Sequence, residues 1–175
     1  MDKVAFGGED DLLSPIYFNL WVTLSRTRYA IFRLREAELK PYHVSPEQSA
    51  TLAVIRGLNN QATPAEIARW LFRKPNTVSA ILKVMERKGL IKKSKDPYAK
   101  NIVRVALTEK GEQAHRDTFN REAVKRIMSV LTKEECDFFQ VCLDKMMAKA
   151  GIELGIEERP LSIFLGANCD KPEQR

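Results

Sequence analysis

The sequence predicts a mainly α-helical fold that carries one small β-hairpin, and three observations support this prediction. Side chains that cap helix starts recur at Ser45, Thr63 and Thr132. The apolar residues around them recur at helical spacing. Residues 91–95 and 102–107 instead flank a six-residue turn, and Val103, Val105 and Leu107 alternate with Ile102, Arg104 and Ala106, as residues of a strand do. With 175 residues, 44% of them hydrophobic, the chain is long enough to bury the core of one such domain.

A long first helix is predicted over residues 14–40. It follows a loose N-terminal arm, residues 1–13, which is rich in glycine and acidic side chains. Ser14-Pro15 opens the helix, and apolar side chains recur along it at helical spacing as far as about Lys40. Pro41 ends it, because proline cannot continue the helical hydrogen bonds.

Two shorter helices carry the same start signal. Ser45 can accept a backbone N–H and Gln48 can reach back to it, so the second helix begins here and runs to about Arg56. Residues 63–66, Thr-Pro-Ala-Glu, repeat this signal for a third helix that stops near Arg73.

A fourth helix is predicted to begin at Pro75 and to extend to about Lys88, where Gly89 fits the left-handed conformation that ends helices. At 100° per residue, one face is apolar and consists of Val78, Ile81, Leu82 and Met85. The opposite face is small and polar, with its positive charge towards the C-terminal half, and consists of Asn76, Ser79, Ala80, Lys83 and Arg87.

The predicted hairpin pairs Ile91 to Lys95 with Ile102 to Leu107 across a six-residue turn, and its tip is basic and exposed. After the hairpin, one helix is predicted from Thr108 to about Val130. A last helix starts at the capping box that Thr132 opens, and Gly151 closes it.

Basic side chains are concentrated between residues 61 and 110. This segment holds twelve Lys and Arg against four Asp and Glu, a net charge of +8, whereas the whole chain carries +6. A local positive field in an otherwise near-neutral protein suits a polyanion. Charge alone leaves two interpretations open, a polyanion-binding surface and a solvated basic face.

The order of the elements is that of a helix-turn-helix followed by a wing. Two short capped helices, a third with a small polar face and a basic hairpin follow one another within about sixty residues. A helix fits the major groove of B-form DNA, and a hairpin beside it can reach phosphates or the minor groove. The sequence therefore predicts a winged helix-turn-helix that binds double-stranded DNA.

The residues also resemble a known family, the MarR-type (multiple antibiotic resistance regulator) winged-helix transcription regulators. The matching segments are Ala62–Ala68, Asn76–Ser79, Met85–Ile91, Asp96-Pro97 and Val105–Gly111. The resemblance implies an obligate homodimer. It implies dimerisation helices at 14–40 and 113–150 around a DNA-binding lobe at 41–112, and it leaves 151–175, with the apolar run 161–165, as a tail without an assigned state.

The predicted DNA contacts form two groups. On the fourth helix, Asn76 and Ser79 are the candidates for base edges, while Thr77 either supports the helix start or contacts a phosphate. The full set on this recognition helix is Lys74, Asn76, Thr77, Ser79, Lys83 and Arg87, the last two for phosphates or guanine. The full set on the wing is Lys93, Lys95, Lys100, Asn101 and Arg104.

Two departures from the family pattern bear on these contacts. Ala80 stands where the family commonly has Arg after Thr-Val-Ser, and residues 99–101, Ala-Lys-Asn, stand where its wing commonly reads Asp-Arg-Arg. Lys and Asn offer a point charge and a donor–acceptor pair but not the planar fork of Arg. We therefore expect weaker or differently specific wing contacts.

The resemblance implies a transcriptional regulator, namely a homodimeric repressor of pseudo-palindromic operators that a small-molecule effector relieves. The alternative is a winged-helix protein-interaction module without specific DNA reading, which the two departures favour and the charge of +8 opposes. The effector would bind between the dimerisation helices and the lobe. Its residues stay unassigned, because the aromatic residues near that crevice are more often core, namely Trp21, Tyr29, Phe32, Tyr42 and His43.

Other classes of function lack support. No nucleophile elbow, glycine-rich phosphate loop or zinc helix occurs, so we expect neither an enzyme nor a cofactor or metal. Cys136 and Cys142 are expected to pack, and Cys169 in the tail to be the exposed thiol. No run of about 18 apolar residues could span a membrane and the start lacks a signal core, so we expect a cytoplasmic protein.

Overall fold

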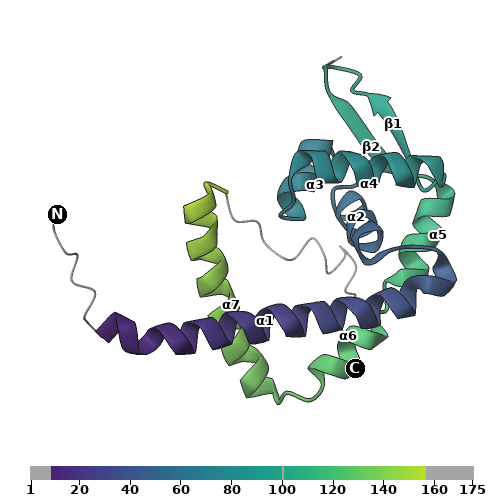
Figure 1. Ribbon diagram of the computed structural model, residues 1–175. Coiled ribbons are helices and arrows are strands. Elements are labelled where there is room, and N and C mark those ends of the chain that lie inside the picture. Colours follow the sequence, from purple (N-terminus) through teal and green to yellow (C-terminus); the bar gives the residue numbers. More distant parts are fainter. Residues whose placement is uncertain (1–8, 100, 157–175) are drawn as a thin grey trace, which may run out of the picture.

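A computed structural model describes residues 9–99 and 101–156 of the chain (Figure 1). The first half holds α1 (Glu9–Leu39), a 3-10 turn (Lys40–Tyr42), α2 (Pro46–Gly57), α3 (Pro64–Trp70) and α4 (Pro75–Arg87). The second half holds β1 (Ile91–Lys95), β2 (Val103–Leu107), α5 (Glu109–Thr118), α6 (Glu122–Met128) and α7 (Lys133–Leu154). The predicted fold class, mainly helical with one antiparallel hairpin, is confirmed.

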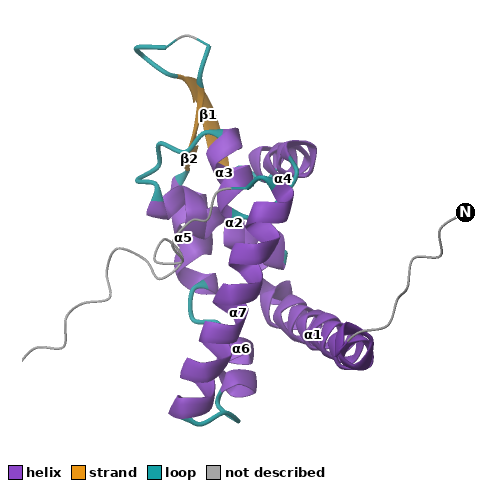
Figure 2. Cartoon of the chain, turned by 90° about the vertical axis from the view of Figure 1, so that its left-hand side faces the viewer, coloured by secondary structure: helices purple, strands orange, loops and turns teal. Residues whose placement is uncertain are grey.

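Most of the helices form one lobe, and the long helix α1 runs beneath it (Figure 1). Helices α2 to α5 gather into the lobe, and the hairpin projects from it on the side away from α1 (Figure 1). Helix α1 runs beneath the lobe and contacts α6 and α2, while α7 stands away from the lobe (Figure 1). A view turned by 90° shows the hairpin again standing clear of the helices (Figure 2). The wing is therefore free to reach a partner beyond the lobe.

The core of the lobe joins the recognition helix to the hairpin. Val78, Leu82 and Met85 of α4 are buried, as the sequence predicts, against Ile55 of α2 and Val105 of β2. Each such fully buried side chain contributes about 1.5–3 kcal/mol. The amide of Val105 donates to the carbonyl of Ala62 at 2.7 Å, so the base of the hairpin is also fastened to the loop before α3. The core therefore fixes α4 and the wing relative to one another.

The predicted helix caps are confirmed. Thr63 accepts from the amide of Glu66 at 3.2 Å, and the Glu66 carboxylate accepts from the amide of Thr63 at 2.8 Å. Ser45 with Gln48 and Thr132 with Glu135 form the same reciprocal pairs. Gly89 has φ +69°, the left-handed conformation predicted at the end of the fourth helix. Local capping thus defines where α2, α3, α4 and α7 begin or end.

Several predicted boundaries are wrong. Residues 9–13 of the expected loose arm belong to α1, while residues 1–8 lie outside the described residues. Helix α3 ends at Trp70 rather than near Arg73, since Phe72 has φ 54°, which a helix cannot include. The second strand begins at Val103, because Ile102 closes the turn by donating to the carbonyl of Ala99.

The single helix predicted from Thr108 to Val130 is wrong, because it is broken into α5 and α6. The carbonyl of Thr118 accepts a hydrogen bond from the Arg35 guanidinium instead of continuing the helical ladder. Arg121 then has φ 52°, and the chain turns before α6 begins. The break lets α6 pack along α1. A long-range contact, invisible to local periodicity, therefore sets this boundary.

The last helix also ends later than predicted. Gly151 is buried inside α7, and the helix ends at Gly155, which has φ +62°. The amide of Ile156 donates back to the carbonyl of Gly151 at 2.9 Å and completes the C-cap. Cys136 on this helix is exposed rather than packed, and Cys142 is half-buried. The apolar run 161–165 and Cys169 lie outside the described residues.

Candidate nucleic-acid interface

The exposed face of α4 carries every residue that the sequence assigns to the recognition helix. Pro75 occupies the first turn, and the buried side chains of α4 hold the helix against the core. The opposite face is exposed along its whole length and presents Asn76, Thr77, Ser79, Ala80, Lys83 and Arg87, with Lys74 just before it. Thr77 is exposed as well, so its side chain is accessible to a phosphate.

The cations of this face have no ion-pair partner among the described residues. Within the described residues, Lys74, Lys83 and Arg87 form no ion pair. Lys74 has extended backbone at the N-cap of α4, without a side-chain cap bond. The first-turn amides of α4 therefore lack a capping side chain, and the positive end of the helix dipole faces outward beside Lys74. Such a face suits phosphate at its ends and base edges in its middle.

Two predicted wing contacts are already occupied by neighbours. Lys93 forms an ion pair with Glu86 of α4, with its Nζ 2.7 Å from the carboxylate. Arg104 donates from Nε to the Asp96 carboxylate at 2.7 Å and from Nη1 to the carbonyl of Gln61 at 2.8 Å. Lys95 and Asn101 are exposed, and Lys100 lies outside the described residues. The wing thus presents fewer free cations than its sequence indicates.

Asp96 anchors the turn of the wing. Its Oδ1 accepts from the amides of Tyr98 and Ala99, both at 2.9 Å, and its Oδ2 accepts from Arg104. The Arg104 guanidinium and the two amides hold the pKa of the Asp96 carboxyl below its usual range. The turn is therefore held in one shape by an ionised carboxylate.

Two exposed cations were missed by the sequence prediction. Arg73 lies in the turn between α3 and α4, and Lys92 lies on β1 beside the predicted Lys93. The alternation of the strand was the available signal for Lys92, since Ile91 is buried and its neighbour faces the other way. No sequence signal marked Arg73, because the third helix was predicted to include it.

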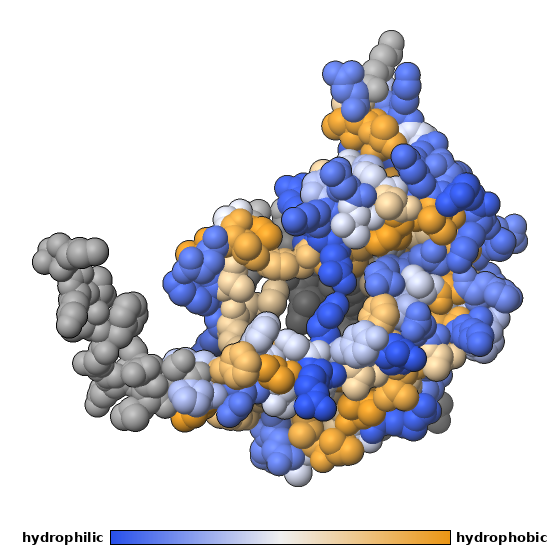
Figure 3. All heavy atoms as spheres, in the orientation of Figure 1, coloured by the Kyte–Doolittle hydropathy of each residue, from blue (hydrophilic) through white to orange (hydrophobic). Residues whose placement is uncertain are grey.

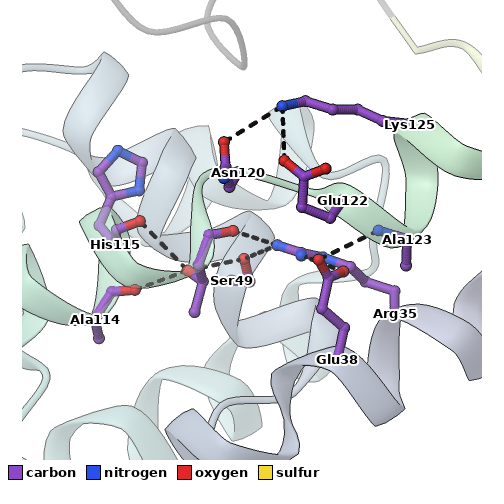
Figure 4. A network of polar contacts seen from close by, with 10 residues as sticks. Arg35, Glu38, Ser49, Ala114, His115, Asn120, Glu122, Ala123 and Lys125 are labelled. Atoms are coloured by element: carbon purple, nitrogen blue, oxygen red, sulfur yellow. Dashed lines mark hydrogen bonds and ion pairs between the residues drawn. The ribbon is translucent and has the colours of Figure 1, made fainter.

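A buried polar cluster joins α1 to the lobe (Figure 4). Arg35 of α1 is 8% exposed and pairs with Glu38 one turn later, with Nη1 2.7 Å from the carboxylate. The same guanidinium donates to Ser49 of α2 and to the carbonyl of Thr118 at the end of α5. We call Arg35, Glu38, Ser49 and Thr118 the latch. It ties the long helix to two helices of the lobe at once.

Glu38 extends the latch to α6. Its Oε1 accepts from the amide of Ala123 in the first turn of α6 at 3.3 Å (Figure 4). Burial acts to raise the pKa of Glu38, but the hydrogen bonds from Arg35 and Ala123 outweigh it and lower that pKa. The carboxylate therefore stays charged where α1, α5 and α6 meet.

A cavity of about 180 Å³ opens between α1 and the lobe. Its walls are mainly apolar, with one acidic and one basic side chain, and consist of Phe32, Pro46, Glu47, Ala50, Leu71, Arg73 and Ile81. Of the aromatic residues near the crevice in sequence, Phe32 alone lines this cavity, whereas Trp21, Tyr29 and Tyr42 are exposed. Arg73, which lines the cavity, lies two positions before the first residue of α4.

Both long helices expose apolar side chains. On the face seen in Figure 3, hydrophobic atoms gather along α1 and along α7. The exposed apolar residues of α1 include Ile16, Tyr17, Phe18, Leu20 and Trp21, and those of α7 include Phe138, Val141, Met146, Met147, Ile152 and Leu154. Gly151 is the only buried residue of α7. These two helices hold most of the exposed large hydrophobic side chains in the described part of the chain.

Two other kinds of site are absent from residues 9–99 and 101–156. No group of three or more His, Cys, Asp or Glu side chains there could hold a metal ion. None of the helices described is both long and apolar enough to cross a bilayer.

Comparison with known proteins supports the arrangement. A family profile described as a winged helix DNA-binding domain matches residues 44–111. The ligand-free structure of the organohalide-sensing transcriptional regulator RdhR-CbdbA1625 is 30% identical, with 87% of this chain and 89% of that chain covered and a TM-score of 0.68. The same regulator with bound 2,4-dichlorophenol gives a TM-score of 0.69.

Two structures with DNA are also similar. MepR from S. aureus in its DNA complex is 25% identical, covering 77% of this chain and 97% of that one, with a TM-score of 0.68. A MarR mutant from E. coli with operator DNA is 23% identical, covers 74% and 96% of the two chains, has a TM-score of 0.65, and shows a shared fold. No curated protein matches the chain.

Proposed function

This chain belongs to the MarR family of winged-helix transcriptional regulators, and from that premise we propose that it binds pseudo-palindromic operators as a homodimer. We further propose that it represses transcription there and that a small molecule releases it. A regulator of this kind acts where genomic DNA is, so the cytoplasm remains our expected location.

The observation that carries the proposal is the exposed face of α4. On one side of this helix, Val78, Leu82 and Met85 are buried. The side chains of the other side are exposed, small and polar, and its cations form no ion pair within the described residues. A polar exposed face is ordinary on a surface helix, but here its middle is made of small side chains, which let a helix enter the major groove. Asn76 and Ser79 are then the proposed base contacts, and Lys83 and Arg87 the proposed contacts to phosphate or guanine.

Dimer formation follows from the uncovered helices. An isolated helix is marginally stable in water, and α7 buries a single residue within the described chain. A second copy of the chain would cover the apolar surfaces of α1 and α7 and would place two α4 helices on one duplex. Half-sites about one helical turn apart are then expected.

The cavity beside Phe32 is the proposed effector site. Its apolar walls suit a small aromatic ring, and Glu47 and Arg73 can orient a hydroxyl or an acidic group. The 2,4-dichlorophenol seen in the similar regulator has this chemistry, which makes substituted phenols the first probes. A phenol should raise the melting temperature of the wild type, and Ala50→Trp, which fills the cavity, should abolish that rise.

The regulator proposal is tested by footprinting the DNA upstream of the gene and its neighbours across a salt series, with random duplex as competitor. Protection of an inverted repeat with a steep salt dependence is expected. Binding that ignores sequence would contradict the proposal and would favour a winged helix that binds protein.

A further inference from the structure

The wing ends in an aromatic ring that packs against nothing. Tyr98 is 98% exposed, the highest value among the large hydrophobic side chains described. Burying a ring of this size would stabilise the protein by kilocalories, so its full exposure forgoes a large gain. A single exposed apolar side chain is common on protein surfaces, but Ile102 and Val103 of the same hairpin are exposed as well, and a group of exposed apolar side chains is typical of a contact with a partner.

The ring is displayed on a rigid support. The backbone of the tip is held by Asp96, which accepts from the amides of Tyr98 and Ala99. Asp96 is held in turn by Arg104, which also donates to the carbonyl of Gln61 before α3. Because residues 96–99 are tied to the lobe by these bonds, little backbone entropy remains to be lost there when Tyr98 meets a surface.

The surroundings of the ring combine apolar area with positive charge. Ile102 and Val103 are 37% and 40% exposed, and Figure 3 shows hydrophobic atoms across the wing below its tip. Residues 91–104 contain five Lys and Arg but one acid, the buried Asp96. An acidic polymer with apolar walls fits this combination, and the minor groove of DNA, lined by deoxyribose C–H groups between phosphates, is such a surface.

The turn lacks the planar guanidinium that could make a bidentate charged contact, and its one cation, Lys100, offers only a point charge. Residues 96–101 contain no arginine, and Arg104 is occupied by Asp96 and Gln61. We propose that Tyr98 is the contact of the wing with the DNA minor groove, its ring along the sugar edges and its hydroxyl donating to a base acceptor. This inference rests on the proposed DNA-binding function and names the residue and groove through which the wing acts.

An uncharged contact makes a specific prediction. Tyr98→Ala should weaken binding to the operator about 5- to 50-fold at every salt concentration, since burying part of an aromatic ring against an apolar surface is worth about this much. The slope of log K against log salt should not change, because no phosphate contact is lost. The matched control on the same hairpin is Lys95→Ala, which should reduce that slope by about 0.9. Tyr98→Phe should retain most of the affinity.

The groove is tested with distamycin, which fills A·T-rich minor grooves. The difference in operator affinity between the wild type and Tyr98→Ala should vanish when distamycin occupies the minor groove in the flanks of the operator. An unchanged affinity for Tyr98→Ala, a changed salt slope, or a difference that survives distamycin would each overturn the proposal. If the wild type binds all duplexes alike, the proposed function fails, and the same comparison on random duplex still decides the role of Tyr98.

Discussion

Replacing Arg35 should destabilise the protein far more than replacing Arg33, which lies two positions earlier on the same helix. Arg35 is 8% exposed, and it binds Glu38, Ser49 and the carbonyl of Thr118. Arg35→Met keeps much of the volume but leaves the Glu38 carboxylate and the Thr118 carbonyl without this donor. Loss of one partner of a buried ion pair costs about 3–5 kcal/mol, and the partial exposure of Glu38 reduces this to about 2–4 kcal/mol.

The same helix supplies the control. Arg33 and Glu36 form an ion pair with the same spacing at 3.6 Å, but both side chains are more than half exposed. Exposed pairs contribute at most about 1 kcal/mol, so Arg33→Met should be nearly neutral. Urea unfolding followed by circular dichroism measures both variants, at one protein concentration, because the stability of a dimer depends on concentration.

A double variant separates the latch from a general loss of packing. If Arg35 and Glu38 act together, Arg35→Met with Glu38→Gln should cost less than the sum of the two single changes, by about 0.5–3 kcal/mol. Equal effects of Arg35→Met and Arg33→Met, or strict additivity in the cycle, would refute the reasoning that the latch joins α1 to the lobe.

Three further predictions follow from single positions. Asn76→Ala should cost about 1–3 kcal/mol of binding free energy on the operator and little on random duplex, and equal losses on both duplexes would contradict its role as a base contact. Lys83→Ala should weaken binding to both duplexes and reduce the salt dependence of binding. Burial lowers the pKa of His115, so its contribution to the free energy of unfolding is full above about pH 6.5 and is lost as pH falls through that lowered pKa. His115→Gln should therefore flatten the pH dependence of unfolding between about pH 7 and 5. Parallel pH curves for the wild type and this variant would contradict the prediction. Gly111→Ala should cost about 1–3 kcal/mol in urea unfolding, because a Cβ there would lie 1.9 Å from the carbonyl oxygen of Leu90, and an unchanged midpoint would contradict this packing.

The parts of the fold that follow from local chemistry were predictable. Capping side chains and proline in the first turn define the starts of α2, α3 and α7, and one apolar face defines how α4 packs. The alternation of Val103, Val105 and Leu107 indicates the second strand of the hairpin. These features depend on residues within a few positions of one another, which a single sequence displays.

The parts that depend on distant contacts were not predictable. The break between α5 and α6 comes from Arg35, more than eighty positions earlier, which takes the carbonyl of Thr118. Contacts inside the fold also explain why the wing differs from its prediction. Arg104 donates to Asp96 and to the carbonyl of Gln61, so it is not the free cation that a count of charges indicates. The end of α7 was mispredicted for a different reason: Gly151 and Gly155 can both end a helix, and local sequence does not decide between them.

Selection from a pool of random duplexes tests the central claim most directly, that the exposed face of α4 reads DNA sequence in a homodimer. The account predicts enrichment of one inverted repeat with half-sites about 10 base pairs apart, and loss of that enrichment in the Asn76→Ala variant with its fold intact. A pool that stays random after repeated rounds with the wild type would contradict it.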